Sequence, residues 1–203
     1  MTRDVNYPHW LLAVFGVFWL TLAIRPHDRV VWLTENAITA IAVVTLVATH
    51  RDWPVSHFSY SLVFVFLVLH TIGAHYTYAR VPLFAVAEAR RGLSLIVLFG
   101  WTRNHYDRLV HFAFGLLIAY PAYELLERYA GPAGAWSYIL SPALIMATSM
   151  AFEVIEWWAA ELLGGPAGSD YVGAQGDPWD AQKDMALATG GALVAMFATA
   201  LMS

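Results

Sequence analysis

Six long apolar runs constrain the fold of this sequence more than any other feature. Each is close to the roughly 20 residues that a helix needs to cross a hydrocarbon core about 30 Å thick. Backbone amides in lipid must be hydrogen-bonded within their own segment, so we expect every run to be a transmembrane helix. The runs lie near residues 8–25, 30–49, 57–79, 106–127, 136–163 and 180–202. The sequence therefore predicts an all-α polytopic membrane protein, with residues 1–203 forming one bundle of six helices.

Composition agrees with this prediction and excludes several classes of function. Of the 203 residues, 59% are hydrophobic and 13% are charged, which is far from ordinary soluble usage. The first run lacks a small-residue cleavage site, so we expect a retained helix and not a removed signal peptide. There is no cysteine, which excludes disulfides, thiolate metal sites and a cysteine nucleophile. The net charge of -4 gives no basic surface for nucleic acid.

The connection between the third and fourth runs, residues 80–105, contains a shorter apolar stretch. "LSLIVLFG" at residues 93–100 has eight residues, too few to span a bilayer. We expect it to lie in the membrane interface or to enter the membrane as a re-entrant segment.

The basic residues predict an orientation. If all six runs cross the membrane, the second, fourth and sixth runs begin on one side, here called the X side. Both termini then lie on the opposite side, called the Y side. Eight of the 11 lysines and arginines lie on or beside the X side, and the Y side has Arg3, Arg51 and Arg128. An excess of positive charge marks the cytoplasmic side. We expect the X side to be cytoplasmic, although some X-side arginines could bind a ligand instead.

Ionisable residues gather at the X ends of the predicted helices. Charged groups inside a membrane segment cost several kcal/mol and normally face the bundle interior. Residues three or four positions apart share one face of a helix. Three pairs have this spacing, namely Asp107 with His111, Glu153 with Glu156, and Asp180 with Asp184. Together with His70 they predict a polar cavity that opens on the X side.

Two imidazoles among several carboxylates suit a divalent metal such as zinc, manganese or iron. The expected metal ligands are His70, Asp107, His111, Glu153, Glu156, Asp180 and Asp184. Catalytic roles are expected for Asp107, His111, Glu153 and Asp184. A metal here could acidify a water and polarise a phosphoryl or carbonyl oxygen. The spacing does not match an established signature such as H-E-x-x-H, so the prediction rests on the group of residues as a whole.

The substrate of such an enzyme would be a lipid or lipid-linked molecule entering from the bilayer, and the reaction a hydrolysis or a group transfer. Arginines suit the recognition of an anionic head group because they can bind it in a bidentate way. The expected substrate-binding residues are Arg103, Arg108, His75, Tyr76, Gln175 and Lys183.

Ordinary structural roles compete with these interpretations. Asp177 precedes a proline and could cap the last helix. Asp180 could favour the positive end of that helix dipole. Glu153 and Glu156 could form buried salt bridges, and a histidine within a helix is often a hydrogen-bonded interior residue. The small residues Gly73, Gly115, Gly190 and Gly191 are expected to allow close helix contacts.

Two other functions also remain open. One is a small proton- or cation-coupled transporter, which would use carboxylates within helices as ion sites. The sequence has no detectable inverted repeats, so such a transporter would need to form a homo-oligomer. The other is a membrane scaffold or head-group binder without enzymatic activity. A haem site is less favoured, because a carboxylate-rich pocket suits a hard cation better than a porphyrin.

Four motifs carry a resemblance to a known family. The sequences "HTIGAHYTY", "YDRLVHFAFGLL", "FEVIEW" and "GAQGDPWDAQKDM" resemble the YjdF-like family of bacterial inner-membrane proteins, whose biochemical role is unassigned. The resemblance extends over nearly the whole chain and implies a multi-pass protein of the bacterial cytoplasmic membrane.

A more distant resemblance is to the VanZ-like superfamily, which is linked with resistance to the glycopeptide teicoplanin. The matching residues are Asp107, Arg108, His111 and Phe112, then Glu153 or Glu156, then Asp184 and Gly190. The arginine that this superfamily usually places before its last helix has no clear counterpart here. Resistance is therefore not implied for this chain.

Overall fold

The chain folds into α-helices joined by turns and connections. The computed structural model describes residues 6–82, 103–131, 134–165, 168, 172 and 174–202, and these contain no strand. Its helices are α1 (Tyr7–Leu22), α2 (Arg29–Thr49), α3 (His57–His75), α6 (Tyr106–Tyr129), α7 (Ala135–Leu163) and α9 (Asp180–Met202). The all-α prediction is confirmed for the described residues. The expected interfacial or re-entrant segment at residues 93–100 lies outside them.

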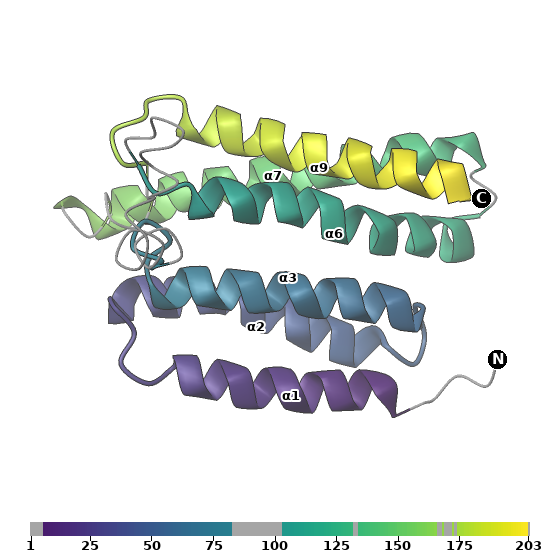
Figure 1. Cartoon of the computed structure of the whole chain (residues 1–203), viewed down its shortest axis with the longest axis horizontal. Coiled ribbons are helices and arrows are strands. Elements are labelled where there is room, and N and C mark those ends of the chain that lie inside the picture. Colours follow the sequence, from purple (N-terminus) through teal and green to yellow (C-terminus); the bar gives the residue numbers. More distant parts are fainter. Residues whose placement is uncertain are drawn as a thin grey trace, which may run out of the picture.

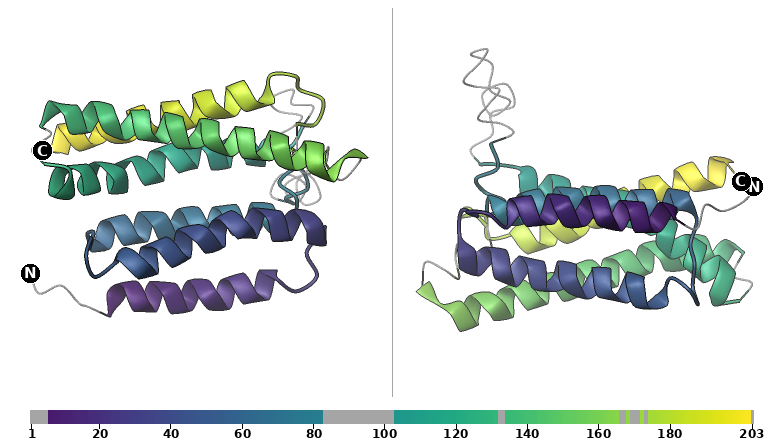
Figure 2. Two further views of the ribbon diagram at one scale, coloured as in Figure 1. Left: turned by 180° about the vertical axis from the view of Figure 1, so that it is seen from behind. Right: turned by 90° about the horizontal axis from the view of Figure 1, so that it is seen from below.

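The helices form two groups that lie against each other (Figure 1). One group contains α1, α2 and α3, and the other contains α6, α7 and α9. Helix α3 packs on α6 and so joins the two groups, while α6 and α9 form the most extensive contact between any two of these helices. The views in Figure 2 show all six running nearly along one axis, with the start of α1 and the end of α9 at the same end.

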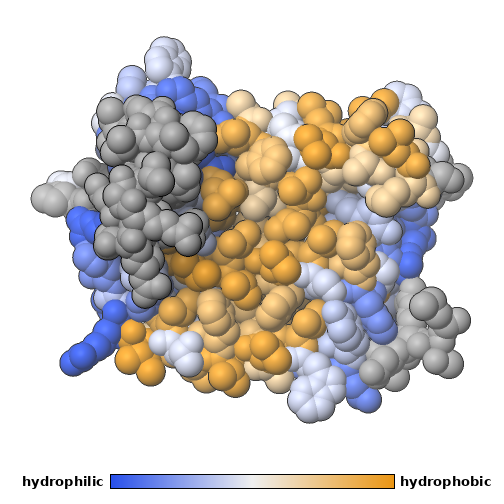
Figure 3. Space-filling model, in the orientation of Figure 1, coloured by the Kyte–Doolittle hydropathy of each residue, from blue (hydrophilic) through white to orange (hydrophobic). Residues whose placement is uncertain are grey.

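Five helices, α2, α3, α6, α7 and α9, are long and apolar enough to cross a membrane. Helix α1 has 16 residues, and at about 1.5 Å per residue its length is only about 24 Å. An apolar band covers the middle of the face shown in Figure 3, with hydrophilic residues toward both ends. Tryptophans occur near the ends of α7, where Trp136, Trp157 and Trp158 are exposed. This distribution is typical of a membrane protein with interfacial aromatic residues.

Two predicted helices are too long at their C-terminal ends. The first ends at Leu22 and not at residue 25, because Arg25 has a positive φ of 52° and is followed by a proline. The third ends at His75 and not at residue 79. Thr77 and Tyr78 have φ values of 53° and 51°, which are incompatible with continuing a right-handed helix. The remaining predicted bounds agree with the structure to within about two residues.

Close contact between α6 and α9 depends on two glycines. A Cβ atom at Gly115 would lie 1.8 Å from the carbonyl oxygen of Ala188, and one at Gly191 would lie 2.2 Å from that of Phe112. The predicted role in close helix contact is confirmed for both. Gly73 instead makes room for the ring of Tyr78, in the turn after α3. It is wrong for Gly190, where a Cβ would meet nothing within 4 Å.

The Y ends of α3 and α6 are joined by the buried carboxylate of Glu124. Its oxygens accept hydrogen bonds from the backbone N–H and the hydroxyl of Ser56, both at 2.8 Å, and from the hydroxyl of Ser59. Arg128 completes the group with an ion pair of 2.5 Å. Because Ser56 is the N-cap of α3, the carboxylate also lies at the positive end of that helix.

Candidate metal centre

Three predicted ligands meet at the X ends of α6 and α9. Asp107 and His111 lie one turn apart on α6, and Asp184 lies in the second turn of α9. One ligand atom from each residue lies within 4.8 Å of the others. His111 Nε2 is 3.6 Å from Asp107 Oδ1. We call Asp107, His111 and Asp184 the trio.

Helix α7 adds a fourth group beside the trio. The Oε1 atom of Glu153 lies 3.6 Å from His111 Nε2. Glu153 also shares a side-chain hydrogen bond with Glu156, so both predicted α7 ligands lie in the same cluster. The structure thus brings together Asp107, His111, Glu153 and Asp184, with Glu156 next to them.

The trio and the neighbouring Glu153 contain carboxylate oxygens that the described residues do not satisfy. Asp184 Oδ1 and Glu153 Oε1 are buried and have no hydrogen-bond partner among the described residues. A buried charge without a partner costs several kcal/mol. Three carboxylates and one imidazole are a suitable donor set for zinc, manganese or iron. The residues present therefore fit a divalent metal.

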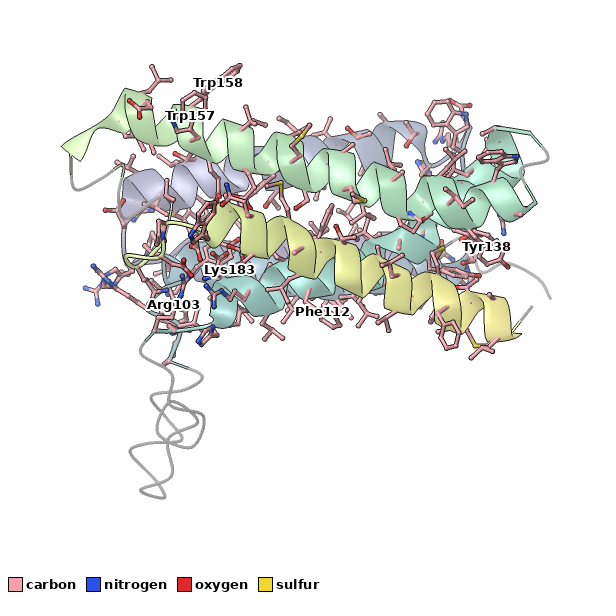
Figure 4. All side chains as sticks on the ribbon, turned by 90° about the horizontal axis from the view of Figure 1, so that it is seen from above. Arg103, Phe112, Tyr138, Trp157, Trp158 and Lys183 are labelled. Carbon is pink, nitrogen blue, oxygen red and sulfur yellow. The ribbon has the colours of Figure 1, made fainter. Side chains whose placement is uncertain are left out.

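Ion pairs lie close to the trio at the entry to α9, where Figure 4 labels Arg103 and Lys183. Arg103 binds Asp180 through two hydrogen bonds, of 2.5 and 3.2 Å. Arg108 and Lys183 each approach Asp177 at 2.5 Å. Asp180, a predicted metal ligand, is thus bound by an arginine. The three basic side chains that were predicted to bind a head group, Arg103, Arg108 and Lys183, all have carboxylate partners.

The environment of Asp177 changes its titration. The hydrogen bond from Lys183, the backbone N–H of Trp179 and the hydrogen bond from Arg108 lower the pKa of this carboxyl to about 2. Its Oδ1 accepts the Trp179 N–H at 3.1 Å, in the turn just before α9 begins. Asp177 therefore stabilises the turn at the start of α9 and binds two basic side chains there, Arg108 and Lys183.

The other predicted substrate-binding residues bind neighbouring parts of the protein. Gln175 exchanges two hydrogen bonds of 3.0 Å with the backbone of Asn104. His75 Nδ1 lies 2.8 Å from the carbonyl oxygen of Leu22, and its ring packs edge-on against Tyr76. These residues lie at the X end of the molecule but outside the trio.

The remaining predicted ligand, His70, belongs to a second polar group on α2 and α3. Its Nδ1 atom is 2.6 Å from the hydroxyl of Tyr78, and its Nε2 atom is 3.8 Å from Oε2 of Glu35. Burial raises the pKa of Tyr78 well above its ordinary value, so the phenol stays protonated. The sequence prediction did not include Glu35 or Tyr78 among the site residues. The position of Glu35 near the X end of its helix was the available signal for it.

A cavity of about 330 Å³ connects the two groups. It lies between α2, α3, α6 and α7. His70, Tyr78, Asp107 and His111 line it near the X end, and the walls closer to the Y end are mainly apolar. The predicted polar cavity is therefore polar only at one end. Its depth is lined by Ile38, Ala42, Phe114, Ile118, Ala122, Leu144 and Ile145, among others.

Comparisons with known proteins identify relatives of the whole chain. A family model described as "Predicted membrane protein (DUF2238)" matches residues 7–203. The chain is 38% identical over 172 residues to the protein named "Inner membrane protein YjdF" of Escherichia coli (strain K12), covering 84% of this chain and 78% of that protein. No solved structure matches.

Proposed function

The chain belongs to the DUF2238 family of predicted membrane proteins, and we propose that it is a metal-dependent enzyme of the bacterial inner membrane. Its substrate is a lipid or lipid-linked molecule, and its reaction is a hydrolysis or group transfer. The observation that carries this proposal is the trio. Its ligand atoms lie within 4.8 Å of one another, and two of its members, Asp107 and His111, line the polar end of a cavity whose walls are mainly apolar.

Asp107, His111 and Asp184 are the residues that would hold the metal. A divalent ion bound there would lower the pKa of a water molecule and polarise a phosphoryl or carbonyl oxygen. Glu153 Oε1, which has no hydrogen-bond partner among the described residues, is placed to accept a proton from that water. His111 and Asp184 are buried among the surrounding helices, and burial strengthens these electrostatic interactions.

The cavity selects the class of substrate. Its apolar walls run from the trio toward the middle of the helices and would take an acyl or prenyl chain. Arg103 and Arg108 each have a buried Nε atom without a hydrogen-bond partner in the described structure. Those two N–H groups would supply unused donors to an anionic head group even while the remaining guanidinium nitrogens bind Asp177 and Asp180. If α1 is a short sixth span, the excess of basic residues on the X side would place that side in the cytoplasm. The head group would then come from the inner leaflet.

The test is a search for a metal-dependent lipid product. Purified protein is reconstituted in vesicles of bacterial lipid extract with Mn²⁺ or Zn²⁺, and the lipids are followed by mass spectrometry. We expect a product that requires the wild-type protein and is absent with a chelator or in the Asp184→Asn and His111→Gln variants. A lipid profile that is the same in all these samples would contradict the proposal. Size-exclusion profiles of the variants establish that they are folded.

A further inference from the structure

Glu35 is a buried carboxylate for which the proposed reaction has no use. It lies on α2 with 0% exposure, and neither of its two oxygens has a hydrogen-bond partner among the described residues. An ionised carboxylate in this position is costly unless a cation or donor reaches it. The unsatisfied oxygens therefore point to a ligand.

His70 is the neighbour that could share this ligand. It is 6% exposed, and its Nε2 atom lies 3.8 Å from Glu35 Oε2. That separation is too long for a hydrogen bond, and a directly paired imidazolium and carboxylate would approach to about 2.7–2.9 Å. The same Nε2 atom also makes a long hydrogen bond of 3.4 Å to the backbone carbonyl oxygen of Glu35. A cation coordinated by the imidazole nitrogen and the carboxylate oxygen would replace this weak contact.

Tyr78 fixes the orientation that such coordination needs. Its hydroxyl is 2.6 Å from His70 Nδ1, so the ring is held from one side and presents Nε2 toward Glu35. Metal-binding histidines commonly have their second ring nitrogen hydrogen-bonded in this way. Tyr78 is a positioning residue in this arrangement.

The second group faces the same cavity as the trio. Helices α2 and α3 belong to one helix group and α6 and α9 to the other (Figure 1). His70 and Tyr78 line the cavity from the first group, and Asp107 and His111 line it from the second. A ligand in the cavity can therefore be approached from both walls.

We propose that Glu35 and His70 bind a second divalent cation, across the cavity from the trio. This inference rests on the proposed function and narrows its substrate class. Two cations on facing walls suit a substrate with several anionic oxygens, because each cation can neutralise a different oxygen. A lipid phosphate or diphosphate is then favoured over an uncharged ester.

The test counts the cation sites directly. Detergent-purified protein is stripped with a chelator and titrated with Mn²⁺, and free Mn²⁺ is measured by electron paramagnetic resonance. We expect the wild type to bind two equivalents of Mn²⁺ per protein. The variants Glu35→Gln, His70→Gln and Asp184→Asn should each bind one. Glu161→Gln, an exposed carboxylate at the X end of α7, is the matched control and should retain two.

A variant of Tyr78 keeps the test informative if Glu35→Gln or His70→Gln fails to fold. Tyr78→Phe should still bind two equivalents of Mn²⁺, but the affinity of one site should fall by about tenfold to hundredfold. The reason is that His70, a ligand of that site, loses its hydrogen bond to the Tyr78 hydroxyl. If the wild type bound only one equivalent of Mn²⁺, and the Glu35, His70 and Tyr78 variants bound the same amount, the second site would be overturned. The proposed function would remain intact. No binding by the wild type would overturn both.

Discussion

At the scale of single residues, the carboxylates at the X end have different environments. Asp177 and Asp180 have cationic partners, whereas Asp184 and Glu153 each have a buried oxygen without a hydrogen bond in the described structure. Burial without a partner costs about 1–3 kcal/mol for a polar group and more for a charged one. The first pair therefore stabilises the entry to α9, and the second pair is available to a ligand.

The ion pairs of Asp177 predict a dependence of stability on pH. Because its pKa in the folded protein is lowered to about 2, these interactions contribute fully above the ordinary pKa of about 3.9. The contribution is lost as the pH falls toward 2. We expect wild-type protein to melt at a higher temperature than Asp177→Asn at pH 7, with a difference that shrinks between pH 4 and pH 2. Intrinsic tryptophan fluorescence in detergent measures both melting curves, and a difference that does not change with pH would contradict this role.

The sequence could predict some of these residues and not others. The four-residue spacing of Asp107 with His111 placed both on one face of α6, and the cost of a charge one turn inside α9 singled out Asp184. Glu35 and Tyr78 could not be assigned in the same way, because their relation to His70 depends on how α2 and the turn after α3 are placed. The partners of Asp180 likewise come from a different part of the chain.

At the scale of helices, α6 and α9 hold the trio because their backbones come very close. We predict that Gly115→Ala and Gly191→Ala each lower the free energy of unfolding by about 1–3 kcal/mol or more, since the added methyl group must force the backbones apart. Gly190→Ala is the matched control, because a Cβ there meets nothing within 4 Å. Thermal unfolding in detergent would contradict this account if all three variants behaved alike.

The Glu124 contact is independent of the trio, since it joins α3 and α6 at the Y end. Glu124→Ala leaves the buried Ser59 hydroxyl and the Ser56 N–H without their acceptor, and we predict a loss of stability of about 1–3 kcal/mol for each of these donors. Arg128→Gln removes a partly exposed ion pair and should cost at most about 1 kcal/mol.

Denaturant titrations in mixed micelles compare these two variants, while metal content checks that folded protein keeps an intact X end. Equal losses for Glu124→Ala and Arg128→Gln would show that the ion pair, and not the serine contacts, carries the stability.

Helix ends mark the limit of prediction from apolar runs. Residues 76–79 are aromatic or small and continue the hydrophobic pattern of α3, yet Thr77 and Tyr78 adopt left-handed backbone conformations. The ring of Tyr78 then packs over Gly73 and contacts His70. A tertiary contact, which periodicity does not reveal, therefore decides where α3 ends.

At the scale of the whole molecule, the two helix groups enclose a cavity that ends at the trio. Ser149 on α7 lines this cavity, is 2% exposed and has no hydrogen bond for its hydroxyl in the described structure. We predict that Ser149→Leu fills the cavity and lowers the rate of lipid turnover about tenfold or more, because a misplaced substrate reacts slowly. Metal content should not change. Met150→Leu, at an exposed neighbouring position, is the control, and equal rates in both variants would argue against substrate binding in the cavity.

The overall architecture was predictable to the level of an all-α membrane bundle, because the length and hydropathy of each run are local properties. The pairing of the helices was not, since the sequence has no signal for α3 joining the two groups. The apolar depth of the cavity follows from that pairing. The sequence predicted polar residues at one side of the membrane but could not show that an apolar chamber lies below them.

The most direct test of the central claim is the metal content of the purified protein, measured by elemental mass spectrometry after purification without chelators. Wild type, Asp184→Asn and Lys183→Gln are compared, the last changing a neighbouring residue whose partner is Asp177. We predict bound divalent metal in the wild type, one equivalent less in Asp184→Asn, and no change in Lys183→Gln. Wild-type protein without metal, or an Asp184→Asn variant with the full wild-type content, would contradict a metal centre at the trio.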